Sequence, residues 1–554
     1  MKQTLYALTA SIAIAGAGIS TAMADAQTGP ESRSEAAAFL NQATFGATAQ
    51  DIQYVMSLRS YGRWLGREFR KPYESILDEV VTVAANSGGG RTSENQSLSA
   101  WLERSIKADD QLRYRAAYAL SQVFATSTAT SLRKSVMHAY FKDVMLRNAF
   151  GNFRDLLEDV TYSQLMGNWL TYINSPKANV DTGSAPDENY AREIMQLFTI
   201  GLVELHNNGT SKTRSGVEVE TYTQEDVTGL AKVFTGLHRA GSSFGARSPT
   251  NNDVNDIYPM QMDDNYHSME EKSFLGITIP ANTSGDESIR IALDKLFNHS
   301  NTGPFIAKAL IKQLVTSNPS GRYVSSVATA FNTGFFAFED SEVDYVFGNG
   351  QRGDMKAVWA AILLNDSARD PRRYRFRSFA KVREPNLRFM HWARISEVEG
   401  FDLGNRHTLF PYGQAMPFRA SSVFNFFRPG YMRPGTITAA EGLSAPELQL
   451  ASSSGIINYI NTMRDYAVRS PIAANFAPQY TTLMSYADKP EELIQLLNEA
   501  MTGGRLEAVS QEKLLQTLNE ISLPEDGDDS EARRNRVKAA VGLVITSIEF
   551  MTAQ

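Results

Sequence analysis

The sequence predicts a mainly α protein, a large multi-helix globular body with one small β-hairpin insertion. Apolar residues recur at three-and-four spacing along most of the chain, as they do on helices that bury one face. Strand-like alternation is scarce, and no linker of useful length or fixed-period repeat divides the sequence. We therefore expect residues 25–554 to form a single large helical domain.

Residues 1–24 have the pattern of a secretory signal peptide. Lys2 supplies the positive start, residues 5–19 form an apolar, alanine-rich run, and Ala22-Met-Ala24 is a small-x-small cleavage site. The run is shorter than the roughly 20 apolar residues that a membrane helix needs, and no later stretch approaches that length. We expect cleavage near Ala24, no transmembrane segment, and a periplasmic or extracellular protein. An uncleaved anchor is the alternative.

The predicted helices follow one another in chain order. The first begins near Ser34, and residues 98–127 carry apolar side chains at the spacing of amphipathic helices. The last begins with Ser530 as its N-cap and continues along one apolar side to Ile548. Between them the same spacing recurs around residues 136–147, 305–315, 355–364, 377–396, 446–468 and 491–501.

One hairpin is expected within this helical body, near residues 203–222. Val217, Val219 and Thr221 alternate with acidic residues, and the Asn-Asn-Gly run at 207–209 favours a turn.

An acidic side chain stands beside the apolar face of the helix predicted over Asn189–Gly201. At about 100° per residue, Glu193 falls at the edge of the apolar arc, beside Leu197. A carboxylate that is partly removed from water has a raised pKa unless a cation pairs with it, and a raised pKa suits a general acid. Glu193 is therefore a candidate catalytic residue, with Arg192 beside it to orient substrate. The alternative is a structural Glu–Arg pair that fastens this helix to a neighbour.

Asp226 stands near the start of a second acidic helix, predicted over Tyr222–Gly236. Because it follows Thr223 by three residues, the two have the pattern of a capping box, with Asp in the place of Glu or Gln. A catalytic role is the alternative. If Glu193 and Asp226 faced one cleft, they would form the carboxylate pair that glycoside hydrolysis uses.

His267 closes a stretch rich in Asn and Asp that begins at Asn251. Oxygen ligands clustered in a loop suit Ca²⁺, and a neighbouring histidine can accept a proton. Calcium is therefore the candidate cofactor and His267 a third candidate catalytic residue. Lys272 could pair with an acid or hold an anionic group of the substrate. A solvated turn without an ion is the alternative, since the pattern of an EF-hand loop is absent.

Seven arginines and Lys381 lie between Arg369 and Arg388, interleaved with aromatic residues. Arginine forks bind carboxylate, sulfate or phosphate, so Arg373 and Arg375 are candidate ligands for an anionic polysaccharide. A solvated helix face that forms salt bridges is the alternative.

The segment from Pro411 to Gly435 carries many aromatic residues and is too apolar to remain in water. We expect it to pack down on the body, where it could wall a pocket and present Arg428 to an anionic substrate.

Several classes of function are excluded. The chain has no cysteine, which rules out thiolate catalysis and cysteine-ligated zinc. The motifs of serine hydrolases, phosphate-binding loops and zinc proteases are absent. The net charge of −7 argues against nucleic-acid binding.

The chain resembles the DUF1800 family, a bacterial family whose domain has no established function. The motifs that carry the resemblance are Phe39–Gly46, Arg113–Gln122, Asn148–Leu157, the two acidic helices, and the segment from His267 through Lys272 to Gly276. The chain departs from the family pattern at Ser268, where an acid is expected, and at Phe418–Gly430, which replaces a tryptophan-containing loop. The resemblance implies export and an exported, sulfatase-like protein encoded alongside as a partner. It implies no particular reaction.

The sequence thus favours an exported hydrolase that cleaves a polysaccharide of the envelope or the environment. Glu193 and Asp226 would do the acid–base work, with His267, Lys272 and Arg192 tuning charge or orienting substrate. The alternative is a non-catalytic envelope protein that binds or assembles with the sulfatase-like partner.

Overall fold

The computed structural model describes residues 28–86, 94–127, 135–246, 254–340, 342–370, 378–403, 416–469, 475–524 and 529–553. Helices dominate these residues, and their strands form only two-stranded antiparallel ladders, which confirms the mainly α prediction. No helix in the described part is both long enough and apolar enough to cross a bilayer. The predicted signal peptide and its cleavage site lie outside the described residues.

The first nine helices form one side and the centre of the body. Side-chain caps begin several of them: Thr48 and Asp51, for example, form a reciprocal capping box at the start of α2. The helices are α1 (Arg33–Ala43), α2 (Ala49–Leu58), α3 (Tyr61–Glu68), α4 (Ile76–Asn86), α5 (Glu94–Lys107), α6 (Gln111–Val123), α7 (Ser135–Asn148), α8 (Phe153–Thr161) and α9 (Gln164–Trp169).

The middle of the chain carries the two acidic helices and half of the short strands in the described residues. The predicted hairpin is confirmed, with β1 paired to β2. The elements are α10 (Asn189–Glu193), the π-helix η1 (Ile194–Thr199), β1 (Thr213–Arg214), β2 (Val217–Glu218), α11 (Gln224–Ala231), the 3-10 helix η2 (Lys232–Phe234), β3 (Leu237–His238), the 3-10 helix η3 (Val254–Ile257), β4 (Gln261–Met262), β5 (Lys272–Phe274), β6 (Ile277–Ile279) and α12 (Gly285–Asn298).

The next elements complete the core. Helices α13 and α14 pack together, and α14 packs on α15, which is buried along its length. The elements are α13 (Thr302–Leu314), α14 (Gly321–Thr333), β7 (Phe336–Phe338), β8 (Tyr345–Phe347), α15 (Met355–Leu363), α16 (Asp366–Arg369), β9 (Lys381–Val382), α17 (Pro385–Ile395) and β10 (Val398–Glu399).

The C-terminal elements return to the start of the chain. They are α18 (Ile437–Ala440), the 3-10 helix η5 (Pro446–Gln449), α19 (Ser453–Arg464), the π-helix η6 (Asp465–Arg469), β11 (Ala477–Pro478), α20 (Thr481–Met484), α21 (Pro490–Leu497), the π-helix η7 (Asn498–Thr502), α22 (Ala508–Glu520), α23 (Ser530–Ile545), α24 (Ile548–Met551) and β12 (Thr552–Ala553).

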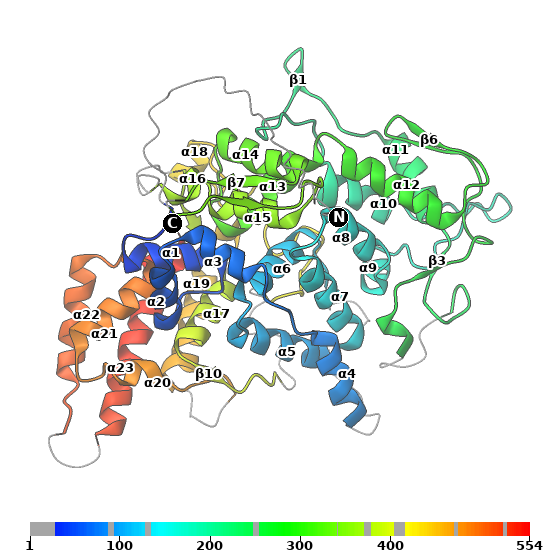
Figure 1. The fold of residues 1–554 in the computed structure, drawn as a ribbon. Helices are drawn as coiled ribbons and strands as arrows, with labels where there is room; N and C mark the ends of the chain where they lie inside the picture. The colour runs from blue at the N-terminus through cyan, green and yellow to red at the C-terminus, as the bar shows by residue number, and fades with distance from the viewer. Residues whose placement is uncertain are drawn as a thin grey trace, which may run out of the picture.

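Both ends of the described chain lie on the same side of the molecule. Figure 1 shows α21 to α23 beside α1 and α2, and η7 packs directly on α1. Strand β12 closes this side by pairing with β9. Helices α9 to α12 lie on the opposite side (Figure 1).

Three expectations about these helices are wrong in detail. Helix α6 is buried from Gln111 to Ser121 on every side, so it is not amphipathic, because other helices cover its polar face as well. The helix expected over 377–396 begins only at Pro385, which occupies its first position, because proline lacks the N–H that a helix interior needs. The C-terminal helix ends at Ile545, and Ile548 is exposed in the separate helix α24, which Ser547 caps.

Candidate functional site

Glu193 lies at the last position of α10, where the helix changes into the π-helix η1. Its side chain is half-buried, and its Oε2 atom is buried with no hydrogen-bond partner among the described residues. Burial raises the pKa of Glu193, and the charge of Arg192 opposes that rise. The partial desolvation predicted from the sequence is confirmed. The alternative was a structural ion pair between Glu193 and an arginine. Glu193 forms no such pair in the described part of the chain.

The π-helix widens the backbone immediately after Glu193. Thr199 donates its hydroxyl hydrogen bond to the carbonyl oxygen of Ile194, five residues back, at 2.5 Å. The π-helix ends at Thr199, and Gly201, which follows the C-cap Ile200, has a φ of +72°, in the left-handed region that glycine tolerates. A Cβ at Gly201 would lie 2.9 Å from the ring of Phe305, so the position also needs glycine for space. Single π turns of this kind are frequent at functional sites.

Polar side chains from α10 and α11 surround this junction. The Arg192 guanidinium donates to Glu188 at 3.3 Å and to Gln224 at 2.9 Å rather than to Glu193. The hydroxyl of Tyr222 donates to Gln196 Oε1 at 3.2 Å, and the charge of Glu193 is among the causes that raise the pKa of Tyr222, after burial. Glu193 therefore has hydrogen-bonding groups nearby, none of which neutralises it.

Asp226 is engaged within the fold through both of its carboxylate oxygens. Oδ2 accepts from the Thr223 backbone N–H at 2.8 Å and from its hydroxyl at 3.2 Å, so the predicted capping box is confirmed. Oδ1 accepts from the backbone N–H of Leu275 at 2.6 Å, which ties the β5–β6 turn to the start of α11. Leu275 has a φ of +49°, and this hydrogen bond helps to hold that strained position.

His267 is fully buried behind the β5–β6 hairpin. Its Nδ1–H donates to the carbonyl oxygen of Thr235 at 2.9 Å, and its Nε2 accepts from the hydroxyl of Ser288 at 3.3 Å. Burial lowers the pKa of His267, with the nearby Lys272 charge acting in the same direction. The imidazole is therefore neutral, bonded at both nitrogens, and closed to solvent.

Lys272 is also fully buried, and its Nζ donates to the carbonyl oxygen of Glu270 at 3.3 Å. The Asn- and Asp-rich stretch before it is only partly described, since residues 247–253 lie outside the described ranges. Within it, Asp256 is buried against Arg239 at 2.9 Å, and Asp263 binds Asn265 in a turn. No group of three or more His, Asp or Glu residues in the described ranges is placed to hold a metal ion.

The arginine stretch is a buried feature where it is described. Arg369, Arg383 and Arg388 are only 4%, 6% and 7% exposed, so the solvated helix face offered as the alternative is wrong for them. They lie under aromatic side chains instead, with Arg388 stacked 3.8 Å from the ring centroid of Tyr459. Arg373 and Arg375 lie outside the described residues.

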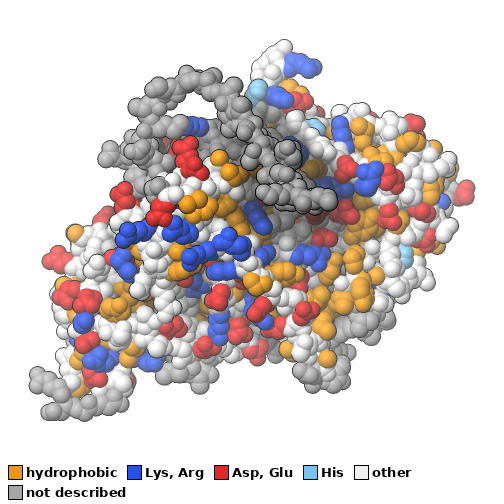
Figure 2. All heavy atoms as spheres, viewed as in Figure 1, with side chains coloured by type: hydrophobic (Ala, Val, Ile, Leu, Met, Phe, Trp, Pro, Cys, Tyr) orange, Lys and Arg blue, Asp and Glu red, His pale blue; other side chains and the backbone are white. Residues whose placement is uncertain are grey.

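Arg428 is exposed on the segment from Met416 to Gly435, and that segment packs down as expected, with Phe418 and Phe427 buried. On the face drawn in Figure 2, the Lys and Arg side chains gather instead over the region of α1 to α3.

An open cleft of about 610 Å³ lies between α8, the β3–β4 ladder and the start of α12. The Tyr162 hydroxyl donates to Asp286 at 2.7 Å within it, and His238 is 8% exposed with no partner at Nδ1 in the described chain. Four separate segments build this cleft, so no local motif marks it in the sequence. Its lining residues are Glu158, Asp159, Tyr162, His238, Pro259, Met260, Gln261, Met262 and Asp286.

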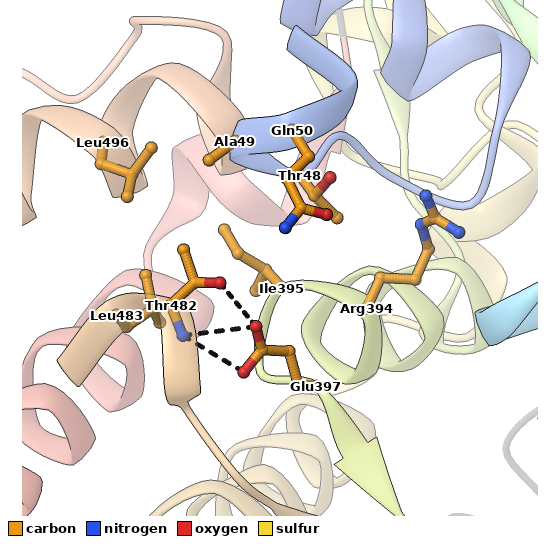
Figure 3. A pocket seen from close by; sticks show the side chains of 9 residues that line it. All are labelled: Thr48, Ala49, Gln50, Arg394, Ile395, Glu397, Thr482, Leu483 and Leu496. Atoms are coloured by element: carbon orange, nitrogen blue, oxygen red, sulfur yellow. Dashed lines mark hydrogen bonds between the residues drawn. The ribbon is translucent and has the colours of Figure 1, made fainter. Parts of the chain in front are cut away.

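A second cavity, of about 60 Å³, lies between the start of α2, the end of α17 and α20 (Figure 3). The Glu397 carboxylate faces Thr482 there and accepts from its hydroxyl at 2.5 Å and its backbone N–H at 3.2 Å. Arg394 points away toward Asp51 and binds it at 2.8 Å. This volume is room for about two water molecules, so the cavity is structural.

The described structure thus brings Glu193, Arg192 and Tyr222 together at one junction. Asp226 joins α11 to the β5–β6 turn, His267 joins Thr235 to α12, and Lys272 binds the Glu270 carbonyl. No curated protein and no solved structure matches the chain. The family described as "Protein of unknown function (DUF1800)" matches residues 38–552, which is nearly the whole chain. The chain therefore belongs to the DUF1800 family.

Proposed function

We propose that this protein is an exported hydrolase that cleaves a polysaccharide, with Glu193 as its general acid. The observation that carries the proposal is the half-buried Glu193 carboxyl, whose Oε2 has no partner among the described residues and whose pKa is raised by burial. A carboxyl group whose pKa is raised by burial holds its proton to higher pH and is better suited to donate it to a leaving oxygen.

In the proposed hydrolysis, one group acts first as an acid and then as a base. Glu193 would protonate the glycosidic oxygen as the bond from that oxygen to the anomeric carbon breaks. Water would then add to the anomeric carbon, and the Glu193 carboxylate would take its proton. The positive charge of Arg192 stabilises the carboxylate between these two steps.

Asp226, His267 and Lys272 contribute to this proposal as supports. Asp226 holds the β5–β6 turn to the start of α11, His267 holds Thr235 to α12, and α10 packs on α11. Tyr222 and Gln224 would offer hydrogen bonds and a ring face to a sugar, groups that suit a polymer rich in hydroxyls. The signal-peptide pattern at residues 1–24 supports an extracytoplasmic substrate.

The test uses purified protein from Asp25 onward, incubated with neutral and acidic polysaccharides and assayed for new reducing ends. We expect the wild type to form product, and Glu193→Gln to lose that product while its melting temperature is maintained. Glu225→Gln is the matched control, because it removes an exposed carboxylate on the neighbouring helix α11. Equal product from wild type and Glu193→Gln, or no product across the panel from folded wild type, would overturn the proposal.

The engagement of Asp226, His267 and Lys272 inside the fold favours a second proposal. In it, the protein is a non-catalytic envelope component that binds or assembles with a co-encoded, exported sulfatase-like protein. Glu193 would then contact the partner rather than a substrate. Co-purification of the two proteins, retained when no polysaccharide is cleaved, supports this proposal, and the failure of the two proteins to associate argues against it.

A further inference from the structure

A cluster of charged side chains is buried where α6, α13, β9 and α17 meet. We name it the basic cluster. Its cations come from four elements, and its two carboxylates come from the residue before α17 and from η5. Its members are Arg115, Lys312, Lys381, Arg383, Arg388, Glu384 and Glu447.

Three of the cations converge on one place. The Arg115 guanidinium donates to the carbonyl oxygen of Gln313 at 2.7 Å, which places it against α13. The ammonium of Lys381 is paired with Glu447, and the charges of both act on Lys312. Glu384 lies within reach of Arg115 and Lys381 and accepts from the Tyr118 hydroxyl at 3.0 Å.

The cluster contains five cations and two carboxylates, so it has an excess of positive charge. Arg115 is 1% exposed, yet its Nε and Nη1 atoms have no acceptor among the described residues, and the same holds for Nε of Arg388. Among the described residues, Lys312 donates only to the Pro429 carbonyl at 3.1 Å and to the Ser444 hydroxyl at 3.3 Å.

Burying cations without counter-charges costs free energy, and the lowered pKa values of the cluster reflect that cost. Burial lowers the pKa of Lys312 to about 8 and that of Arg383 to about 9. An anion beside Arg115 would supply the acceptors that its Nε and Nη1 atoms lack among the described residues, and would add counter-charge to that of Glu384 and Glu447.

One member of the cluster, Lys312, is only half-buried, and the Pro429 carbonyl that it binds follows directly after the exposed Arg428. The cluster therefore reaches the surface at Lys312. Exposed positive charge attracts anions toward such a position.

We propose that the basic cluster is a binding site for a tetrahedral oxyanion, a sulfate or phosphate that is either free or carried as an ester on a sugar. A doubly charged oxyanion matches the excess of cations better than a single carboxylate, and guanidinium forks bind its oxygens in pairs. The site is separate from Glu193, so it goes beyond the hydrolase proposal and does not depend on it.

Binding is measured by calorimetry and by thermal melting at constant ionic strength, with four probes: sodium sulfate, sodium phosphate, glucose 6-sulfate and glucose 6-phosphate. We expect at least one probe to bind saturably and to raise the melting temperature. We expect Lys312→Gln to weaken that binding about tenfold or more, since it removes the half-buried cation at the entrance. Lys489→Gln is the matched control, because Lys489 is exposed at the N-cap of α21 and pairs only with Glu492 in the described chain.

Arg115→Lys is the second variant, because it keeps the charge and loses the fork, and it too should weaken binding. Binding of the free ions identifies an inorganic ligand, whereas binding of the esters alone identifies the group on a sugar. Unsaturable effects from all four probes, or equal affinity in wild type, Lys312→Gln and Arg115→Lys, would overturn the proposal. All measurements are repeated in Glu193→Gln, which lacks the proposed general acid, so that failure of the two proposals can be told apart.

Discussion

The carboxylate of Asp226 accepts a hydrogen bond from the backbone N–H of Leu275, 49 residues away in sequence and 2.6 Å away in space. The same carboxylate caps α11 through Thr223. One side chain thus fixes both the start of a helix and the turn of the β5–β6 hairpin.

Replacing Asp226 with Ala is expected to lower the free energy of unfolding by about 1–3 kcal/mol. The change removes the helix cap and leaves the N–H of Leu275 without its acceptor. Urea unfolding of the two proteins measures the difference. Glu218→Ala, which removes an exposed carboxylate from β2, should stay within about 0.5 kcal/mol of wild type. An Asp226→Ala protein as stable as wild type would contradict the role assigned to this carboxylate.

Glu193→Gln is expected to leave the protein at least as stable as wild type at neutral pH. Burial raises the pKa of Glu193 above its ordinary 4.5, so its contribution to stability is present below that pH and is lost as the pH rises through the folded-state pKa. Glutamine does not ionise, so the variant does not lose stability in this way. The free energy of unfolding of the variant, relative to that of wild type, should therefore increase as the pH rises from 4 to 8. Thermal melting across that range checks the sign. A variant that becomes relatively less stable with rising pH would show that Glu193 has a cationic partner.

His267→Gln is expected to cost about 2–4 kcal/mol, because it disrupts the paired bonds to Thr235 and Ser288 in a fully buried position. Burial lowers the pKa of His267 below its ordinary 6.5. The imidazole therefore contributes stability above pH 6.5 that is lost as the pH falls through the folded-state pKa. The advantage of wild type over the variant should shrink on acidification. The exposed His206→Gln serves as the control, and a pH-independent difference would contradict this account.

Treatment with a chelator such as EDTA is expected to change the melting temperature by less than about 1 °C, because no bound ion would be lost from the folded state. The reason is that the described acids of the Asn- and Asp-rich stretch already have protein partners, Arg239 for Asp256 and Asn265 for Asp263. A clear fall in melting temperature that added Ca²⁺ reverses would establish a calcium site instead.

The features that sequence predicts best here are those with a local cause. The Thr223–Asp226 box and the hairpin at 213–218 depend on residues a few positions apart, and both formed as expected. The half-buried position of Glu193 followed from helical periodicity alone. The π-helix that follows Glu193 could not be predicted, because no residue pattern separates a π-helix from an α-helix.

The burial of the charged residues depends on long-range packing, which the sequence does not show. Arg369, Arg383 and Arg388 belong to a charged run that is typical of a solvated surface, yet aromatic side chains from distant segments cover them. Arg115 was equally hidden from sequence reasoning, because it occupies what would be the polar face of α6 if other helices did not enclose it. Periodicity shows that a helix has two faces, but it cannot show how many of them are buried.

The π-helix at 194–199 amounts to one surplus residue accommodated inside a helix. Removing a single residue from it would restore the ordinary repeat without turning the residues before it, because the wide turn already absorbs the extra residue. The wide turn beside Glu193 is therefore a matter of chain length as much as of residue type. A relative that kept the glutamate but lacked the extra residue would carry that carboxyl on an ordinary α-turn instead.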